Sequence, residues 1–337
     1  MRKPDFERNT LKVLQKGIPE RPCLFDLFLN PTYYLRLSGR KEWPQDPVEQ
    51  MRTIAEAMAA AGYDYASVHA SDFYFPTKPR EYTGTVSIND GCVITDWESF
   101  EKYQWMDAGK ADYSRLEKIA QYLPEGQKLM VYGPNGMLEN TIGLVGYENL
   151  CIMVHEEPEL VKEITDRVGQ SLVTYYEIAA QSDAVGIIVS NDDWGFNTQT
   201  FLSPAHMREY IFPWHKKIVE IAHKNNKPCV LHSCGYFGDV IEDIIEELKF
   251  DGRHSYEDNI IPVEKAYDQY GGRIAILGGM DMDMMTRADP DTIYRRSRAM
   301  VERSREKGGY ALGTGNSVPQ YIPFENYMAM VRAAMDD

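Results

Sequence analysis

The sequence predicts a (β/α)₈ barrel, in which eight parallel strands alternate with helices around a packed centre. Eight short apolar segments recur along the 337 residues, and stretches with helical periodicity lie between most of them. A doubly wound open sheet is the competing fold, and it often carries a glycine-rich phosphate loop after its first strand. Residues 29–34 (Leu-Asn-Pro-Thr-Tyr-Tyr) contain no glycine, so we favour the barrel.

Each apolar segment has the length of a strand. The predicted strands are residues 22–28, 64–68, 128–132, 184–190, 228–232, 250–254, 273–277 and 309–313. The segment from about residue 71 to about 125 is an insertion between the second and third strands. No Pro-, Gly- or Ser-rich linker divides the chain, so residues 1–337 are expected to form one barrel domain.

The helices have recognisable starts. Residues 157–180 place apolar side chains at three-to-four spacing after Pro158, which predicts a long amphipathic helix. Ser203 and Asp289 are each followed by proline. A capping side chain before a proline is typical of the first residues of a helix.

The composition argues against several classes of protein. The formal net charge is −15, from 36 Lys and Arg against 51 Asp and Glu, which disfavours nucleic acid and anionic membranes as partners. No apolar run reaches the ~18 residues of a membrane span, and residues 1–7 lack a signal-peptide core. The five cysteines are odd in number and scattered. This pattern indicates a reducing compartment, so we expect a cytoplasmic protein.

His232 and Cys234 carry the strongest chemical signal, because they directly follow the predicted fifth strand. In a barrel, the residues after the strands share one mouth. Neutral imidazole and thiolate are preferred ligands of zinc. Glu257, after the sixth strand, is our preferred third ligand and would leave the fourth position open, as in catalytic zinc sites. His254 is the rival, since alternation along the strand turns these two side chains to opposite sides.

Polar residues after other strands complete the predicted site. Asp192 and Asp193 follow the very apolar fourth strand and are predicted to orient substrate or to move protons. The residues predicted to bind substrate are Asp26, Asn30, Tyr33, Asn191, Trp194, His254 and Asn316. Aromatic side chains in the pocket would favour a flat substrate. Four histidines on helical faces or away from strand ends are expected to be structural: His69, His206, His215 and His223.

Several segments of the chain resemble the uroporphyrinogen decarboxylase superfamily. They are residues 191–195 (Asn-Asp-Asp-Trp-Gly), 231–235 (Leu-His-Ser-Cys-Gly), 254–258 (His-Ser-Tyr-Glu-Asp) and 318–326. The resemblance covers nearly the whole chain from Arg21 onward. It implies a (β/α)₈ barrel with its site at the C-terminal mouth. The superfamily includes decarboxylases and zinc-dependent methyltransferases that exchange methyl groups with corrinoid proteins.

Departures from the family pattern favour the methyltransferases. The decarboxylases carry a Met-Arg-Gln-Ala-Gly-Arg-Tyr signature after the first strand, whereas residues 25–30 here contain no arginine and place Asp26 there. The decarboxylase histidine after the last strand is replaced by Asn316. The His-x-Cys-Gly sequence resembles that of cobalamin-independent methionine synthase, which implies zinc ligation by His232, Cys234 and Glu257. The last cysteine of that enzyme's ligand set is Asn316 or a neighbour here, which weakens a thiol-methylating role.

We therefore interpret the chain as a zinc-dependent methyltransferase, the O-demethylase component that moves a methyl group from a methoxylated compound to a corrinoid protein. An aryl methyl ether is one such compound. Zinc would act on the ether oxygen as a Lewis acid, and a partner protein would carry the corrinoid (cobalamin). Methyl transfer from a methylated corrinoid to a thiol, decarboxylation, and a non-catalytic barrel that binds corrinoid or tetrapyrrole are alternatives. A homodimer would fit the superfamily, but no sequence feature decides this.

Overall fold

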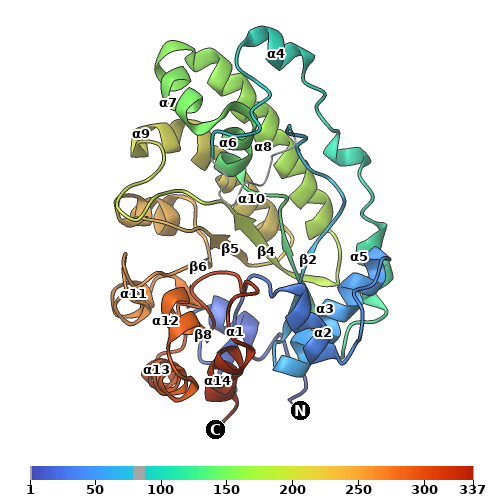
Figure 1. The fold of residues 1–337 in the computed structure, drawn as a ribbon, viewed down its shortest axis with the longest axis vertical. Helices are drawn as coiled ribbons and strands as arrows, with labels where there is room; N and C mark the ends of the chain where they lie inside the picture. The colour runs from blue at the N-terminus through green and yellow to red at the C-terminus, as the bar shows by residue number, and fades with distance from the viewer. Residues whose placement is uncertain (1, 79–87, 337) are drawn as a thin grey trace.

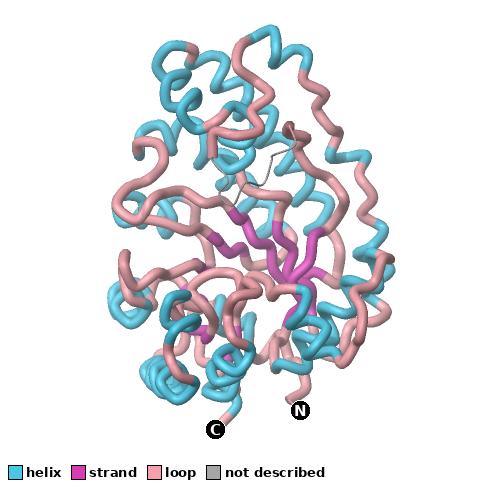
Figure 2. The backbone as a smooth tube through the Cα atoms, in the orientation of Figure 1, coloured by secondary structure: helices cyan, strands magenta, loops and turns pink. Residues whose placement is uncertain are grey.

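Eight parallel strands form the centre of the computed structural model, which describes residues 2–78 and 88–336. Figure 2 shows these strands surrounded by helices and loops. The sheet order is β1-β8-β7-β6-β5-β4-β3-β2. The strands are β1 (Cys23–Leu24), β2 (Tyr65–His69), β3 (Lys128–Tyr132), β4 (Val185–Asn191), β5 (Cys229–His232), β6 (Gly252–His254), β7 (Ala275–Leu277) and β8 (Tyr310–Leu312). Each overlaps a predicted strand, and the predicted barrel is confirmed.

The helices follow the strands in turn (Figure 1). They are α1 (Thr10–Leu14), α2 (Pro31–Ser38), α3 (Pro47–Ala61), α4 (Trp97–Lys102), η1 (Ala108–Lys110), α5 (Ser114–Ala120), α6 (Met137–Val145), α7 (Tyr147–Glu156), α8 (Pro158–Ala180), α9 (Pro204–His206), η2 (Met207–Ile211), α10 (Phe212–Lys224), η3 (Gly238–Val240), η4 (Asp243–Glu247), α11 (Val263–Tyr270), α12 (Met282–Arg287), α13 (Pro290–Ser304) and α14 (Phe324–Met335). Among the described residues, none of these helices combines the length and apolar composition that a membrane span requires.

The predicted helix starts are confirmed. Ser203 accepts a hydrogen bond from the backbone N–H of His206 at 3.2 Å as α9 begins. Asp289 accepts one from Thr292 at 2.9 Å as α13 begins. In both cases the proline that follows occupies the first helical position, where no backbone N–H is needed.

The segment between β2 and β3 contains α4, η1 and α5. Its residues 79–87 lie outside the described part of the chain. Helix α5 packs on α3, as a barrel helix between two strands does, so the insertion ends before α5. In Figure 1, α4 lies at the same end of the molecule as α6 and α7. Helix α4 therefore lies at the end of the barrel that carries the strand C-termini.

The described residues show no ladder pairing between β1 and β2. Hydrogen bonds from side chains connect these two strands instead. The Tyr65 hydroxyl donates to the backbone oxygen of Asp26 at 2.8 Å and accepts from the Asp26 N–H at 2.8 Å. The Ser67 hydroxyl donates to the Leu27 carbonyl. These hydrogen bonds satisfy backbone groups that a regular ladder would otherwise pair.

Asp26 is fully buried at this junction. Its Oδ1 accepts from the Thr314 backbone N–H at 2.9 Å and from the Thr314 hydroxyl, and its Oδ2 accepts from the Tyr63 hydroxyl. Tyr63 in turn contacts the Tyr327 hydroxyl at 2.9 Å. Burial raises the pKa of Asp26 to about 6, against the lowering effect of these hydrogen bonds. A carboxylate that carries a charge here therefore costs folding free energy.

The pKa of Asp26 predicts how stability changes with pH. Because the folded-state pKa lies above the unfolded one, the stabilising contribution is present in full at low pH and is lost as pH rises through about 6. An Asp26→Asn variant carries no charge at any pH. Relative to wild type, its free energy of unfolding should rise by about 2 kcal/mol between about pH 4 and about pH 8. Urea unfolding of both proteins across this range tests it, and a constant difference would contradict it.

Candidate functional site

Asp193, His232 and Cys234 form the candidate metal group, with ligand atoms that all lie within 4.8 Å of one another. His232 ends β5 and Cys234 lies in the turn after it, while Asp193 follows the end of β4. The Asp193 carboxylate accepts from the Cys234 backbone N–H at 2.8 Å, which joins the two loops. Imidazole nitrogen, thiol sulfur and carboxylate oxygen are all zinc ligands. The residues present therefore fit a zinc ion.

Gly235 allows the turn after β5 to form. Its φ is +85°, a left-handed conformation that glycine adopts without strain. A Cβ atom at this position would lie 2.0 Å from the Gly195 carbonyl oxygen, so no larger residue fits. The Gly235 N–H donates to Glu257 Oε1 at 3.1 Å. Two successive backbone amides of one turn thus hold two carboxylates, those of Asp193 and Glu257.

Glu257, the predicted third ligand, lies beside the metal group but is not one of the residues within the 4.8 Å limit. Asp193, which we predicted as a catalytic residue, is one of them. Both carboxylates contact the turn that carries Cys234. The structure therefore offers two candidates for the third ligand, on the β4 loop and on the β6 loop.

The Cys234 sulfur is surrounded by polar groups. The Asn316 amide donates to it at 3.1 Å, and the Ser255 hydroxyl donates at 3.6 Å. Burial, and then the charge of Asp193, raise the pKa of the Cys234 thiol above its ordinary value. A thiol in these surroundings needs a cation to lose its proton, and a metal ion provides one.

His232 is buried and turns its two nitrogens to different neighbours. Its Nε2 lies 3.9 Å from the Cys234 sulfur, and its Nδ1 lies 2.7 Å from Nδ1 of His254. Burial, and then the charge of Arg253, lower the pKa of His232 to about 3. His232 is therefore the neutral imidazole that binds metals. His254, the rival ligand, lies behind His232 on the side away from the thiol.

A cavity of about 600 Å³ opens in front of the metal group. The described residues that line it are Leu27, Phe28, His69, Ser71, Asp72, Phe73, Tyr74, Phe75, Tyr132, Gly133, Pro134, Asn135, Glu139, Asn140, Asn191, Asp193, His232, Asn316 and Ser317. Most of the aromatic rings belong to residues at or after the ends of β1, β2 and β3. Many of the polar groups come from residues after β3, β4 and β8. Rings of Phe28 and Tyr132 stack with centroids 5.8 Å apart, and His69 lies 4.0 Å from Tyr132. These three rings form an aromatic cluster in the cavity lining, with the His69 ring tilted by 47° to that of Tyr132.

Glu139 is a candidate functional residue that the sequence pattern did not predict. This residue lies in the first turn of α6, lines the cavity, and accepts from the Gly136 N–H at 2.9 Å. Burial, and then the charges of Asp193 and Asp192, raise the pKa of Glu139 to about 8. A carboxyl group with that pKa holds a proton at neutral pH and can give it to a bound substrate. Glu139 lies a few residues after the end of β3, and we had not considered the residues that follow this strand.

Our expectation that His69 lies away from the strand ends is wrong, while a structural role for it stays a prediction. His69 is the last residue of β2 and lines the cavity. The predicted strand stopped one residue too early, and strand ends are the positions that a sequence pattern places least securely. His206, His215 and His223 lie on helices or helix ends, as expected.

Asp192 lies in the wall behind the cavity and is 0% exposed. Its carboxylate accepts from the backbone N–H groups of Leu138 and Glu139, each at 2.9 Å, at the start of α6. It also contacts Trp194 Nε1 and His215 Nε2, both at 2.9 Å. Asp192 therefore fastens three segments together, whereas Asp193 reaches the cavity.

Two of the seven residues predicted to bind substrate, Asn191 and Asn316, line this cavity. The polar atoms of the others mainly hold loops and helices: Asn30, for example, accepts from the Tyr33 N–H at 3.1 Å and caps α2. The five that do not line the cavity are Asp26, Asn30, Tyr33, Trp194 and His254. All five are buried, and each makes a hydrogen bond to a group inside the protein.

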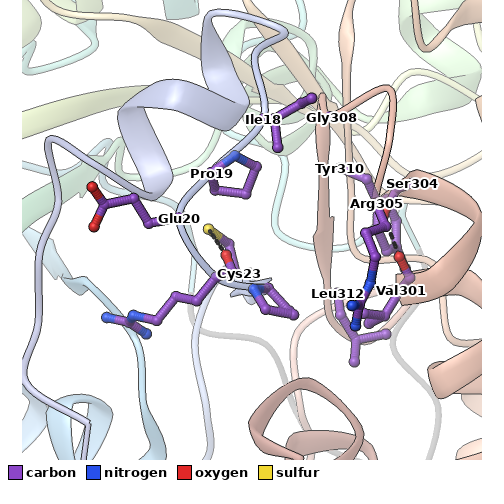
Figure 3. Close-up of a pocket in the computed structure, with 12 residues that line it drawn as sticks. Ile18, Pro19, Glu20, Cys23, Val301, Ser304, Arg305, Gly308, Tyr310 and Leu312 are labelled. Carbon is purple, nitrogen blue, oxygen red and sulfur yellow. Dashed lines mark hydrogen bonds between the residues drawn. The ribbon is translucent and has the colours of Figure 1, made fainter. Parts of the chain in front are cut away.

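A second, smaller cavity of about 140 Å³ lies at the N-terminal ends of β1 and β8 (Figure 3). The segment from Ile18 to Cys23 forms one side, and residues of α13 and β8 form the other. Burial raises the pKa of the Cys23 thiol, which donates to the Arg21 carbonyl at 3.5 Å. A protonated thiol of this kind is unreactive. The metal group and its cavity are at the opposite end of the strands.

Comparison with known families identifies the chain. Residues 133–336 match the family model for uroporphyrinogen decarboxylase. The chain belongs to this family. Within the family, it is 24% identical to a methylated-thiol–coenzyme M methyltransferase from Methanosarcina mazei, over 57% of this chain and 49% of that protein. It is 23% identical to a uroporphyrinogen decarboxylase from Geobacter sulfurreducens, over 56% of this chain and 53% of that protein.

These matches span about half the length of the curated relatives. A solved structure of a methyltransferase from Methanosarcina mazei resembles this member of the uroporphyrinogen decarboxylase family over its length. That structure has a TM-score of 0.70 and 15% identity, and the match covers 99% of each chain. The likeness shows a shared fold.

The two neighbouring aspartates should respond differently to replacement. Asp192→Ala leaves three buried donors and one partly buried donor without their acceptor, so it should lower the free energy of unfolding by about 3–5 kcal/mol. Asp193→Ala, the matched control at the cavity, should lower it by about 1 kcal/mol or less. Urea unfolding measures both, and equal losses would contradict the assignment of Asp192 to the wall.

Proposed function

We propose that this member of the uroporphyrinogen decarboxylase family is a zinc-dependent methyltransferase that passes a methyl group from a methoxylated donor to a corrinoid protein. The observation that carries the proposal is the Asp193–His232–Cys234 group at the cavity. A relative named as a methylated-thiol–coenzyme M methyltransferase supports methyl transfer. An ether is a poor methyl donor because its alkoxide leaves badly, so the enzyme must activate the oxygen.

His232 and Cys234 would hold the zinc, together with Asp193 or Glu257. When bound, zinc would supply a Lewis acid for the ether oxygen. The Asn316 amide donates to the Cys234 sulfur and limits the negative charge that collects there. The loop amides of Cys234 and Gly235 keep the two carboxylates in place.

Glu139 is the residue best placed to protonate the oxygen that loses its methyl group. It lines the same cavity as the metal group, and its raised pKa keeps the proton on it near neutral pH. The cluster of Phe28, Tyr132 and His69 rings in the lining favours an aromatic donor, since aromatic rings pack by stacking or edge contact. We therefore propose an aryl methyl ether as the donor.

Decarboxylation of a tetrapyrrole fits this cavity poorly. The described lining residues include the carboxylates Asp72, Glu139 and Asp193 and no lysine or arginine. A substrate with eight carboxylates would be repelled by the carboxylates of Asp72 and Asp193, and the described lining offers no basic side chain to bind it. The family name alone therefore does not assign that activity to this chain.

Methyl transfer from a methylated corrinoid to a small thiol is the second candidate function. It is favoured by the name of one relative, a methylated-thiol–coenzyme M methyltransferase. A thiol acceptor would be activated by the same metal, which lowers thiol pKa values. Assays with and without added thiol, using methylated corrinoid protein as donor, separate this activity from O-demethylation.

Loss of His232 should remove both metal and activity. Purified wild-type protein should contain about one zinc per chain, as expected for one His–Cys site. In His232→Ala, zinc content by elemental analysis and demethylation of aryl methyl ethers should both fall to background. His155→Ala, which removes an exposed imidazole on α7, should change neither. Full activity in a folded His232→Ala variant would refute the proposed site.

The third ligand can be identified with two further variants. Asp193→Ala and Glu257→Ala each remove one of the carboxylates held by the β5 turn. The variant that removes the true ligand should bind zinc at least roughly 10–100-fold more weakly, because loss of a residue that only supports a ligand already costs that much affinity. Zinc competition titrations compare the two. Unchanged affinity in both variants would contradict a carboxylate ligand.

A further inference from the structure

A chain of buried hydrogen bonds leads from the barrel centre to the metal group. The Thr314 backbone oxygen contacts His254 Nε2 at 3.0 Å. His254 Nδ1 contacts His232 Nδ1 at 2.7 Å. His232 Nε2 then faces the Cys234 sulfur at 3.9 Å. His254 is 0% exposed, so water does not compete for its contacts with Thr314 and with the His232 Nδ1.

The Thr314 carbonyl determines where the protons lie. A carbonyl oxygen can only accept, so His254 Nε2 must carry the hydrogen. The described residues place no carboxylate against His254, and a second proton on this buried ring would be a charge without a partner, so the His254 Nδ1 is left as an acceptor. The His232 Nδ1 must then be the donor between the two rings. This leaves the His232 Nε2 without a proton on the side of Cys234.

We propose that His254 is a positioning residue that fixes His232 in the tautomer required for metal binding before any metal arrives. We had predicted His254 as a substrate-binding residue or a rival ligand, and its position behind His232 gives it this different role. Ligating histidines generally donate their second nitrogen to an acceptor, which sets tautomer and ring orientation. Here that acceptor is another imidazole, whose own tautomer a backbone carbonyl sets.

The barrel centre holds Thr314 in place. The Thr314 N–H donates to Asp26 at 2.9 Å, its hydroxyl donates to the same carboxylate, and Tyr63 donates to Asp26 from β2's side. Asp26 is thereby connected to the metal group through Thr314, His254 and His232, although its carboxylate does not line the cavity.

The tautomer of His232 can be measured directly. In zinc-free wild-type protein with ¹⁵N-labelled histidines, long-range ¹H–¹⁵N NMR correlations report which ring nitrogen carries the proton. We expect His232 to be protonated at Nδ1 and His254 at Nε2. A His232 ring protonated at Nε2, or an equal mixture of the two tautomers, would overturn the proposal. This measurement needs no variant and no bound metal.

Two variants of His254 test the consequence for metal binding. His254→Leu removes the acceptor and should weaken zinc binding by roughly 10–100-fold, with the Nε2–H tautomer of His232 appearing in the NMR spectrum. His254→Asn keeps an acceptor oxygen near the position of Nδ1 and should retain most of the affinity. A folded His254→Leu protein with wild-type zinc affinity would overturn the positioning role, as would equal losses in the two variants.

We build this inference on the proposed metal site, and the two can fail separately. If His232→Ala keeps its zinc, the metal site is wrong, whatever the tautomer of His232 is. If His232→Ala loses its zinc but the free protein shows His232 protonated at Nε2, the metal site stands and the role of His254 is wrong. Circular dichroism of each variant establishes that the compared proteins are folded.

Discussion

The site depends on the burial of one carboxylate, that of Asp192. Four donors converge on it, from the start of α6, from Trp194 and from His215 on α10. A buried charge is tolerated only when it is paired and hydrogen-bonded in this way. With Asp192 held in the wall, its neighbour Asp193 reaches the cavity and contacts the turn that carries Cys234. The hydrogen bonds of Asp192 therefore determine the position of the loop after β4, and with it the position of the candidate ligand Asp193.

The cavity combines two chemically different sides. The candidate metal ligands come from the loops after β4 and β5, and aromatic rings come from the segments at or after the ends of β1, β2 and β3. Glu139, from the start of α6, adds a carboxyl group that holds its proton. An enzyme that must bind a flat donor, polarise one oxygen and protonate it needs these groups around one space. This combination is what the proposed methyl transfer requires.

Sequence patterns predicted the fold and the His232–Cys234 pair well, because both depend on local features. Strands and helix caps follow from periodicity and from short-range hydrogen bonds, and two ligands in one turn are neighbours in any fold. Asp26, Asn30 and Trp194 show the limit of that reasoning. They follow strands, as substrate-binding residues do in barrels, but their polar atoms contact buried partners far along the chain. Position after a strand does not reveal which way a side chain turns.

The sequence by itself determined the eight strands, the barrel and the imidazole–thiol pair at its mouth, since these are encoded within short stretches of chain. Only the tertiary structure decided which carboxylates approach that pair, that Glu139 and His69 face the cavity, and that His254 lies behind His232. Those outcomes depend on contacts between loops separated by tens of residues. Their directions are set by packing and by the need to satisfy buried hydrogen-bonding groups, which no local pattern records.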